Sequence, residues 1–217
     1  MKRDYFDNIG PVYKFWCSVA IFLESILPFN LARKCIKKNI KDFSEKWVVI
    51  HTILSVLAAV VTSQMDSVVI SKILVIYAMV RIFEIIIYQI NVLIFHPYRA
   101  MVLEGADEYI LQNPYRSVVL LGHNLVEIIF WFTAVLGYIQ TIRIPLIQAL
   151  MENTIRIFTF NYERIPGQPT ELQYVIFAEV LCGVILVIIS LAKFIGELPH
   201  VNLKFEDQGE ISQNNKE

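Results

Sequence analysis

The residues best suited to chemistry form one short polar stretch between two long apolar runs. They are Thr159, Phe160, Asn161, Tyr162, Glu163 and Arg164. Together they offer backbone carbonyls, a hydroxyl, a carboxylate and a guanidinium. Rings of carbonyl oxygens or of charged side chains select ions in channel pores. The stretch therefore predicts ion coordination in a filter or pore loop rather than the making and breaking of bonds.

A second candidate is one face of the last apolar run, because residues three and four apart share a helix face. A carboxylate in a membrane helix is costly and usually faces a water-filled path or a partner. We expect this face to form the inner cavity and gate, with Glu179 attracting cations. The alternative is a buried pair of Glu179 with His123 or Arg81. The face consists of Glu179, Gly183, Leu186 and Ser190.

Two further pairs of polar residues lie in apolar runs. Arg81 and Glu84 are spaced to pair within one helix. A voltage sensor needs a series of basic residues, so a structural ion pair is the favoured interpretation. His123 and Glu127 are also spaced to meet on one helix. We expect a hydrogen-bonded structural pair there, and a metal site is the less favoured alternative.

The sequence gives no support to an enzyme. The cysteines Cys17, Cys35 and Cys182 have no metal-ligand spacing and indicate no disulfide framework. We find no nucleophile constellation, phosphate-binding glycine loop or zinc-protease motif. We therefore expect no catalytic residue, no metal and no cofactor.

The composition indicates that these residues are positioned by membrane helices. Of the 217 residues, 56% are hydrophobic and 18% are charged, whereas soluble domains are about 45–50% apolar and about 25% charged. A bilayer core requires about 20 apolar residues as a helix. Val12 to Leu27 is shorter and carries two charges, so we expect it to lie in the interface, with spanning as the alternative. The four predicted spans are Trp47 to Ser63, Ile73 to Phe95, Val118 to Gln140 and Leu172 to Ile195.

The basic run before Trp47 sets the predicted orientation, because Lys and Arg near span ends favour the cytoplasmic side. We therefore expect a multi-pass protein of the cell (inner) membrane whose C-terminus is cytoplasmic. The ordinary role of such a run is binding to anionic lipid. A nucleotide or oligonucleotide ligand is the alternative. The candidate residues are Arg33, Lys34, Lys37, Lys38 and Lys41.

Five segments are predicted along the chain. An N-terminal interfacial segment is followed by a two-helix membrane unit, a cytoplasmic linker, a pore module and a polar tail. In the linker, Pro97 is expected to end the preceding helix, and residues 100–112 have the spacing of an amphipathic helix on the inner membrane surface. A plain connector is the alternative. The segments are 1–46, 47–95, 96–117, 118–196 and 197–217.

The segment between the last two predicted spans is too apolar at its start for a simple loop. Pro145 suits the first turn of a helix, and Leu146 to Ile157 supports about three turns, which is half a membrane thickness. Non-helical backbone at membrane depth is tolerated only where protein or a water-filled cavity covers it. A short helix followed by an extended polar stretch therefore predicts a re-entrant pore loop.

Val118 to Ile195 resembles the two-helix pore module of potassium-channel-like tetrameric cation channels. Thr159 and Tyr162 match the family's Thr-Val-Gly-Tyr-Gly-Asp filter, and Gly183 takes the place of its hinge glycine. The resemblance implies an all-α homotetramer that conducts inorganic ions. Each subunit is expected to give four transmembrane helices, or five with the N-terminal run, and one re-entrant loop.

Three residues depart from the family's filter, namely Asn161, Glu163 and Arg164. Filter glycines adopt backbone angles that other residues reach only at a cost of about 1 kcal/mol or more. We therefore predict that potassium selectivity is lost and that rings of Glu163 or Arg164 set a weak ion preference. The alternative is that these two residues pair at the outer rim and stabilise the loop.

No sizeable soluble sensor domain is evident, so gating is expected to come from the membrane, a small ligand or a regulatory protein. In this respect the chain resembles small channel effectors of bacterial phage defence of the Hailong type, which implies a nucleotide or oligonucleotide signal. One rival function is a non-conducting membrane scaffold in which the loop is a plug. Another is a small-solute transporter, which would be expected to show paired broken helices, whereas the sequence indicates one.

Overall fold

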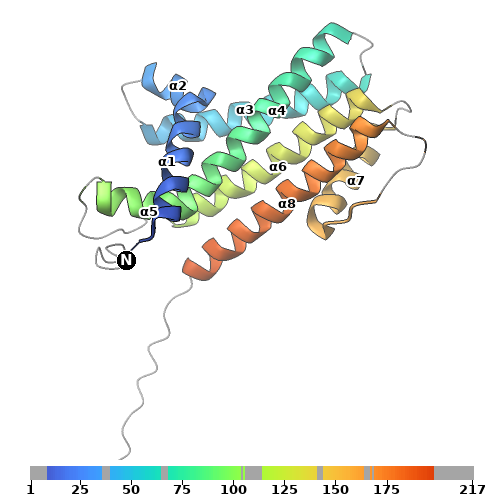
Figure 1. The fold of residues 1–217 in the computed structure, drawn as a ribbon. Helices are drawn as coiled ribbons and strands as arrows, with labels where there is room; N and C mark the ends of the chain where they lie inside the picture. Colours follow the sequence, from blue (N-terminus) through green and yellow to red (C-terminus); the bar gives the residue numbers. More distant parts are fainter. Residues whose placement is uncertain are drawn as a thin grey trace, which may run out of the picture.

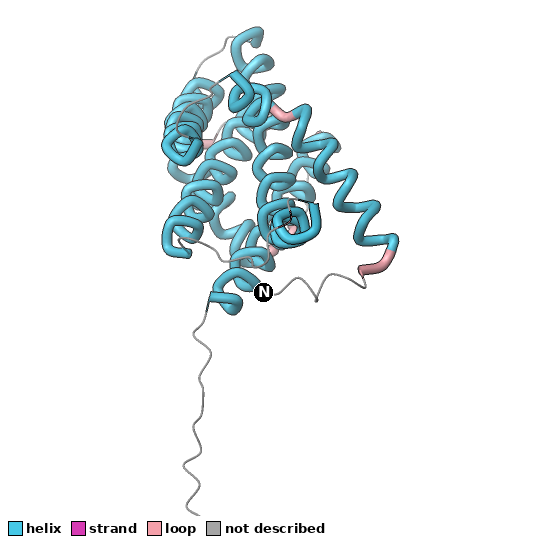
Figure 2. The backbone as a smooth tube through the Cα atoms, turned by 90° about the vertical axis from the view of Figure 1, so that its left-hand side faces the viewer, coloured by secondary structure: helices cyan, strands magenta, loops and turns pink. Residues whose placement is uncertain are grey.

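The computed structural model describes residues 9–35, 40–64, 68–103, 105, 114–140, 144–163, 167 and 169–197. Within these residues the chain is built from helices and short loops and contains no strand (Figure 2), which confirms the all-α prediction. The helices are α1 (Pro11–Ile26), α2 (Pro28–Cys35), α3 (Ile40–Gln64), α4 (Val68–Ile90), α5 (His96–Tyr98), α6 (Pro114–Ile139), α7 (Leu146–Thr159) and α8 (Thr170–Glu197), and two π-helical turns are η2 (Asn91–Phe95) and η3 (Arg99–Leu103).

The long helices α3, α4, α6 and α8 form a bundle, with α1 and α2 towards one end and α7 at the other (Figure 1). Helices α3 and α6 share the largest helix–helix interface and run in the same direction. At one end, the Arg116 side chain of α6 donates to Glu45 of α3 over 2.6 Å. At the other end, Gly137 of α6 lies against Thr62 of α3. Helices α4 and α8 return between these ends.

Three helices of the described chain are long and apolar enough to cross a membrane, namely Phe43–Gln64, Val118–Ile139 and Thr170–Ala192. They coincide with three of the four predicted spans. The fourth, Ile73 to Phe95, is helical as α4 and η2 but is not among them. Helices α1 and α2 together would make a further span, broken by a bend of 67°. The interfacial position expected for Val12 to Leu27 therefore stays a prediction.

The core of the bundle combines bulky side chains with small ones. Trp131 and Phe132 of α6 are buried against Ala58 and Ala59 of α3 and Ala78 of α4. Small residues let helix backbones approach closely, which is the main source of packing between helices in a bilayer. Many large apolar side chains point outward instead, as a lipid-facing surface requires.

The end of α4 differs from the predicted stop at Pro97. Helical winding continues from α4 through η2, α5 and η3 to Leu103. Pro97 lies in the first turn of α5, directly after the π-helical turn. Proline cannot donate the N–H of a continuing helix, and here π-helical winding interrupts the regular α-helical hydrogen bonds on both sides of it. The predicted amphipathic helix over 100–112 falls mostly outside the described residues.

Candidate functional site

Helix α7 is held against α6 and α8 by polar side chains on its buried face. Asn153 donates from Nδ2 to Oγ1 of Thr133 on α6 over 2.8 Å. Arg156 donates to Oε2 of Glu179 on α8 over 2.7 Å. Arg156 also donates to Oδ1 of Asn153 over 2.8 Å. One network of hydrogen bonds therefore fixes the position of α7 relative to both long helices.

Helix α6 ends and helix α8 begins at the same end of the bundle. Successive contacts along α7 lie progressively further from that end. Thr133, which meets Asn153, lies about 9 Å from the end of α6 at about 1.5 Å per residue. Gly183, which meets Ile157, lies roughly 20 Å along α8 from its first residue, Thr170. Helix α7 therefore starts near the end of the bundle and finishes well inside the length of α8 (Figure 1).

Gly183 makes the closest approach between α7 and α8. A Cβ atom at this position would lie 2.8 Å from the carbonyl oxygen of Ile157 and 3.2 Å from its Cα. Real Cβ contacts of 2.8 Å are essentially absent, and here the opposing atom belongs to the backbone. The absence of a side chain at Gly183 therefore allows α7 to dock on α8.

The predicted filter begins as helix rather than as an extended stretch. Thr159 is the last residue of α7, and its hydroxyl donates to the Ile155 carbonyl over 2.8 Å. Phe160 then ends the helix in the left-handed region, with φ of 54°. Such a φ is uncommon for a bulky residue. The strained position is therefore Phe160, and not one of the positions at which the potassium-channel family has glycine.

After Phe160 the chain leaves the helix. Asn161, Tyr162 and Glu163 are non-helical and exposed, and Arg164 lies outside the described residues. The Tyr162 ring packs edge-on against Phe177 of α8, with ring centroids 6.1 Å apart. Phe177 precedes Gly183 along α8, so the chain is already returning towards the start of α8 at this point. The segment exposes its polar groups on the surface of the protomer.

The prediction that one face of α8 lines an inner cavity is corrected by the packing. Glu179 is 0% exposed, and Gly183 and Leu186 are also buried. Ser190 is half-buried and donates to the Leu186 carbonyl over 2.6 Å. In the protomer this face packs against α7 and the core because Gly183 lets α7 approach. It is not left free to face water.

The predicted partners of Glu179 were also wrong. The carboxylate pairs with Arg156, and not with His123 or Arg81. Its second oxygen, Oε1, is buried and has no hydrogen-bond partner among the described residues. Arg156 was missed by the sequence reasoning, although the one basic residue of the short helix α7 was a usable signal. A charge buried in a bilayer needs a partner, so Glu179 required a basic residue on a neighbouring helix.

Replacing Glu179 by glutamine is expected to lower the free energy of unfolding by about 1–2 kcal/mol. The side chain keeps its shape but loses the charge that balances Arg156. The loss is limited because Arg156 keeps its bond to Asn153 and its side chain is 13% exposed. Thermal unfolding in detergent measures the effect. A melting temperature equal to that of the wild type would contradict the assigned ion pair.

A second buried polar centre joins α4 to α6. Arg81 pairs with Glu84 on its own helix, as predicted, and its Nε also donates to Oε1 of Glu127 on α6 over 2.6 Å. The indole of Trp131 donates to the same Glu127 oxygen over 3.0 Å. The predicted pair of His123 with Glu127 is therefore wrong. His123 is exposed, and its Nδ1 lies 3.0 Å from the Val119 carbonyl oxygen.

The predicted basic cluster is described only in part. Arg33 and Lys34 are exposed on α2. Lys37 and Lys38 lie outside the described residues, as does the side chain of Lys41. In the described part of the chain, no group of three or more His, Cys, Asp or Glu side chains is arranged to hold a metal ion.

Comparison of the chain with protein-family models, with curated proteins and with solved structures finds no significant match. The resemblance to potassium-channel pore modules therefore remains an interpretation of Thr159, Tyr162 and Gly183.

Proposed function

We propose that the protein forms an ion-conducting pore in a membrane, as a homotetramer in which α6, α7 and α8 of each copy surround the path. One observation carries the proposal. The non-helical, exposed segment from Phe160 to Glu163 follows a helix that ends roughly 20 Å along the membrane-length helix α8. Backbone without helical hydrogen bonds cannot face lipid at that depth. Further copies of the chain around a watery path would supply the cover it needs.

The chemistry of the exposed segment supports a weakly selective pore. Asn161, Tyr162 and Glu163 present an amide, a hydroxyl and a carboxylate on the surface of the protomer. In a closed ring of copies, Glu163 would form a ring of negative charge of the kind that favours cations. The glycine-based carbonyl geometry of a potassium filter is missing, so we propose a cation preference without strong selection for potassium.

The proposed placement is the cell (inner) membrane, with the C-terminus and the basic residues of α2 on the cytoplasmic side. Arg33 and Lys34 are exposed there to any anionic ligand. Gating by a nucleotide or oligonucleotide signal, or by a regulatory protein, fits these charges and the resemblance to small phage-defence effectors. Adding anionic nucleotides to that side of a silent channel tests the gating separately from conduction.

Single-channel recording of the purified protein in planar bilayers, under a potassium, sodium and chloride gradient, tests the pore. We expect discrete currents, and Glu163→Gln should lower the cation-to-anion permeability ratio about threefold or more because it removes the charged ring. Glu171→Gln makes the same charge change on the exposed first turn of α8 and is the matched control. Currents that respond equally to both substitutions would place the path elsewhere. Silence with and without nucleotides would favour a non-conducting scaffold.

A small-solute transporter gains support from one observation. Besides α7, the chain has a second interrupted helix, because α1 and α2 meet at a 67° bend. Paired broken helices are typical of secondary transporters. The same recordings separate the two functions, since a transporter gives slow, saturable solute uptake into vesicles and no discrete current steps.

A further inference from the structure

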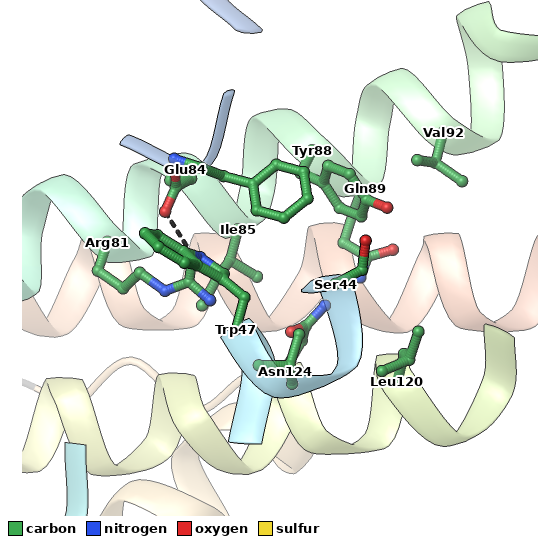
Figure 3. Close-up of a pocket in the computed structure, with 12 residues that line it drawn as sticks. Ser44, Trp47, Arg81, Glu84, Ile85, Tyr88, Gln89, Val92, Leu120 and Asn124 are labelled. Atoms are coloured by element: carbon green, nitrogen blue, oxygen red, sulfur yellow. Dashed lines mark hydrogen bonds and ion pairs between the residues drawn. The ribbon is translucent and has the colours of Figure 1, made fainter. Parts of the chain in front are cut away.

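A cavity lies between α3, α4 and α6 (Figure 3), and Phe29 of α2 is also among its lining residues. Its volume is about 70 Å³. Since one water needs about 10–15 Å³ of such space, the cavity has room for a small polar head group and not for a whole drug-sized ligand. Apolar walls come from residues such as Ile85, Val92 and Leu120, and aromatic walls come from Trp47 and Tyr88.

Two amide side chains face this cavity without a partner. Gln89 of α4 is 5% exposed and Asn124 of α6 is 4% exposed. Within the described part of the chain, the structure gives neither side chain a hydrogen bond, although both line the cavity. Figure 3 shows them projecting into the space beside Ser44. Their amide atoms are not among the fully buried, unpartnered side-chain atoms of the described chain, so they reach the open space of the cavity and can bond to a molecule held there.

The lining of the cavity has no net charge. Arg81 reaches it, but its guanidinium is already bonded to the carboxylates of Glu84 and Glu127. An anionic group would meet no unpaired cation among the described lining residues, and it would lie near two carboxylates. The remaining polar groups are the two amides, the hydroxyls of Ser44 and Tyr88 and the indole N–H of Trp47. Ser44 already has a partner, whereas the two amides can both donate and accept hydrogen bonds. The site therefore suits an uncharged group that also donates and accepts.

The cavity lies at the level of a membrane interface. Ser44 and Trp47 are in the first turns of the spanning part of α3, and Leu120 and Asn124 are in the first turns of the spanning part of α6. Trp and Tyr side chains concentrate at this level of a bilayer. A ligand there can place a polar head among the amides and an apolar chain along the helices.

From these four observations we propose that the cavity binds an uncharged amphipathic lipid, of the monoacylglycerol class, through its hydroxyl and ester groups. Gln89 and Asn124 hydrogen-bond to the glycerol head. Ile85, Val92 and Leu120 contact the start of the acyl chain. The site lies at the end of the bundle opposite α7 and the exposed segment that follows it, and the proposal does not depend on conduction.

The test uses a monoacylglycerol with a diazirine and an alkyne in its acyl chain, added to the full-length protein in detergent. Light-induced labelling should saturate and map to peptides of α4 and α6 that line the cavity. Gln89→Leu and Asn124→Leu should each raise the half-saturation concentration of labelling about tenfold, because each removes hydrogen bonds to the glycerol head. Gln140→Leu, an amide-to-leucine change at the opposite end of the bundle, should leave it unchanged.

Stability and competition distinguish a ligand site from a structural role. Leucine replaces the unpartnered amides by apolar groups of similar shape, so the melting temperatures of Gln89→Leu and Asn124→Leu should equal or exceed that of the wild type. Lower melting temperatures would show that the amides serve the fold and would overturn the proposal. Unchanged labelling in both variants would also overturn it, as would stronger competition by phosphatidylglycerol than by unlabelled monoacylglycerol.

Discussion

Replacing Arg81 by methionine should lower the free energy of unfolding by about 3–5 kcal/mol, the usual cost of leaving a buried charge without its partner. The substitution leaves two buried carboxylates without a cationic partner, because Glu84 and Glu127 both bond to this one guanidinium. All three residues are buried. It also removes the contact of the guanidinium with the Trp47 ring, 5.9 Å from the ring centroid. Thermal unfolding in detergent, followed by tryptophan fluorescence, measures the loss.

A compensated variant shows whether charge balance is the cause. Arg81→Met combined with Glu84→Gln and Glu127→Gln removes every charge of the cluster, so it should recover a large part of the lost stability. Lys72→Met changes an exposed lysine on the same helix and should stay close to the wild type. If the triple variant proved as unstable as Arg81→Met alone, the loss would come from packing and not from stranded charge.

The second large effect is expected at Gly183, where alanine should lower the free energy of unfolding by about 1–3 kcal/mol and abolish channel currents. The added Cβ would lie 2.8 Å from the Ile157 carbonyl, so α7 must move away from α8. Arg156 and Glu179 connect the same two helices, so this displacement also strains their ion pair. Calorimetry or fluorescence gives the stability, and planar-bilayer recording gives the current.

Gly122→Ala supplies the matched control, because Gly122 is also in the middle of a long helix. A Cβ there would meet nothing within 4 Å. Alanine is the better helix former by about 0.5–1 kcal/mol, so this variant should be slightly more stable than the wild type. The two glycine-to-alanine changes are therefore expected to have opposite signs. Stabilisation by both substitutions would contradict the close contact of α7 with α8.

The helices were largely predictable, because their lengths follow from the bilayer and their composition from lipid exposure. The short helix after Pro145 was predicted to end at Ile157, and it ends at Thr159. The pair of Arg81 with Glu84 followed from spacing on one helix. Features that depend on a single helix, such as its limits and the pairs along one face, could therefore be predicted from periodicity and composition.

Contacts between helices were not predictable in the same way. Glu127 bonds to Arg81 across 46 residues of sequence, and Arg156 bonds to Glu179 across 23. Which partner a buried charge takes depends on the rotation of each helix about its axis, and hydropathy alone does not fix that rotation. For the same reason Gly183 was assigned to a hinge, whereas the structure uses it as the surface on which α7 rests.

The hydrogen bond at the start of α2 can form only after α4 has been synthesised. Phe29, in the first turn of α2, donates its backbone N–H to Oε1 of Glu84 over 2.5 Å, and 55 residues separate the two positions. Glu84 thus occupies the start of α2 as a capping residue would. Chains grow from the N-terminus at about 5–20 residues per second, so the first helices must wait several seconds for their acceptor to be made. Helices α1 and α2 therefore reach their final positions only after the middle of α4 has been made.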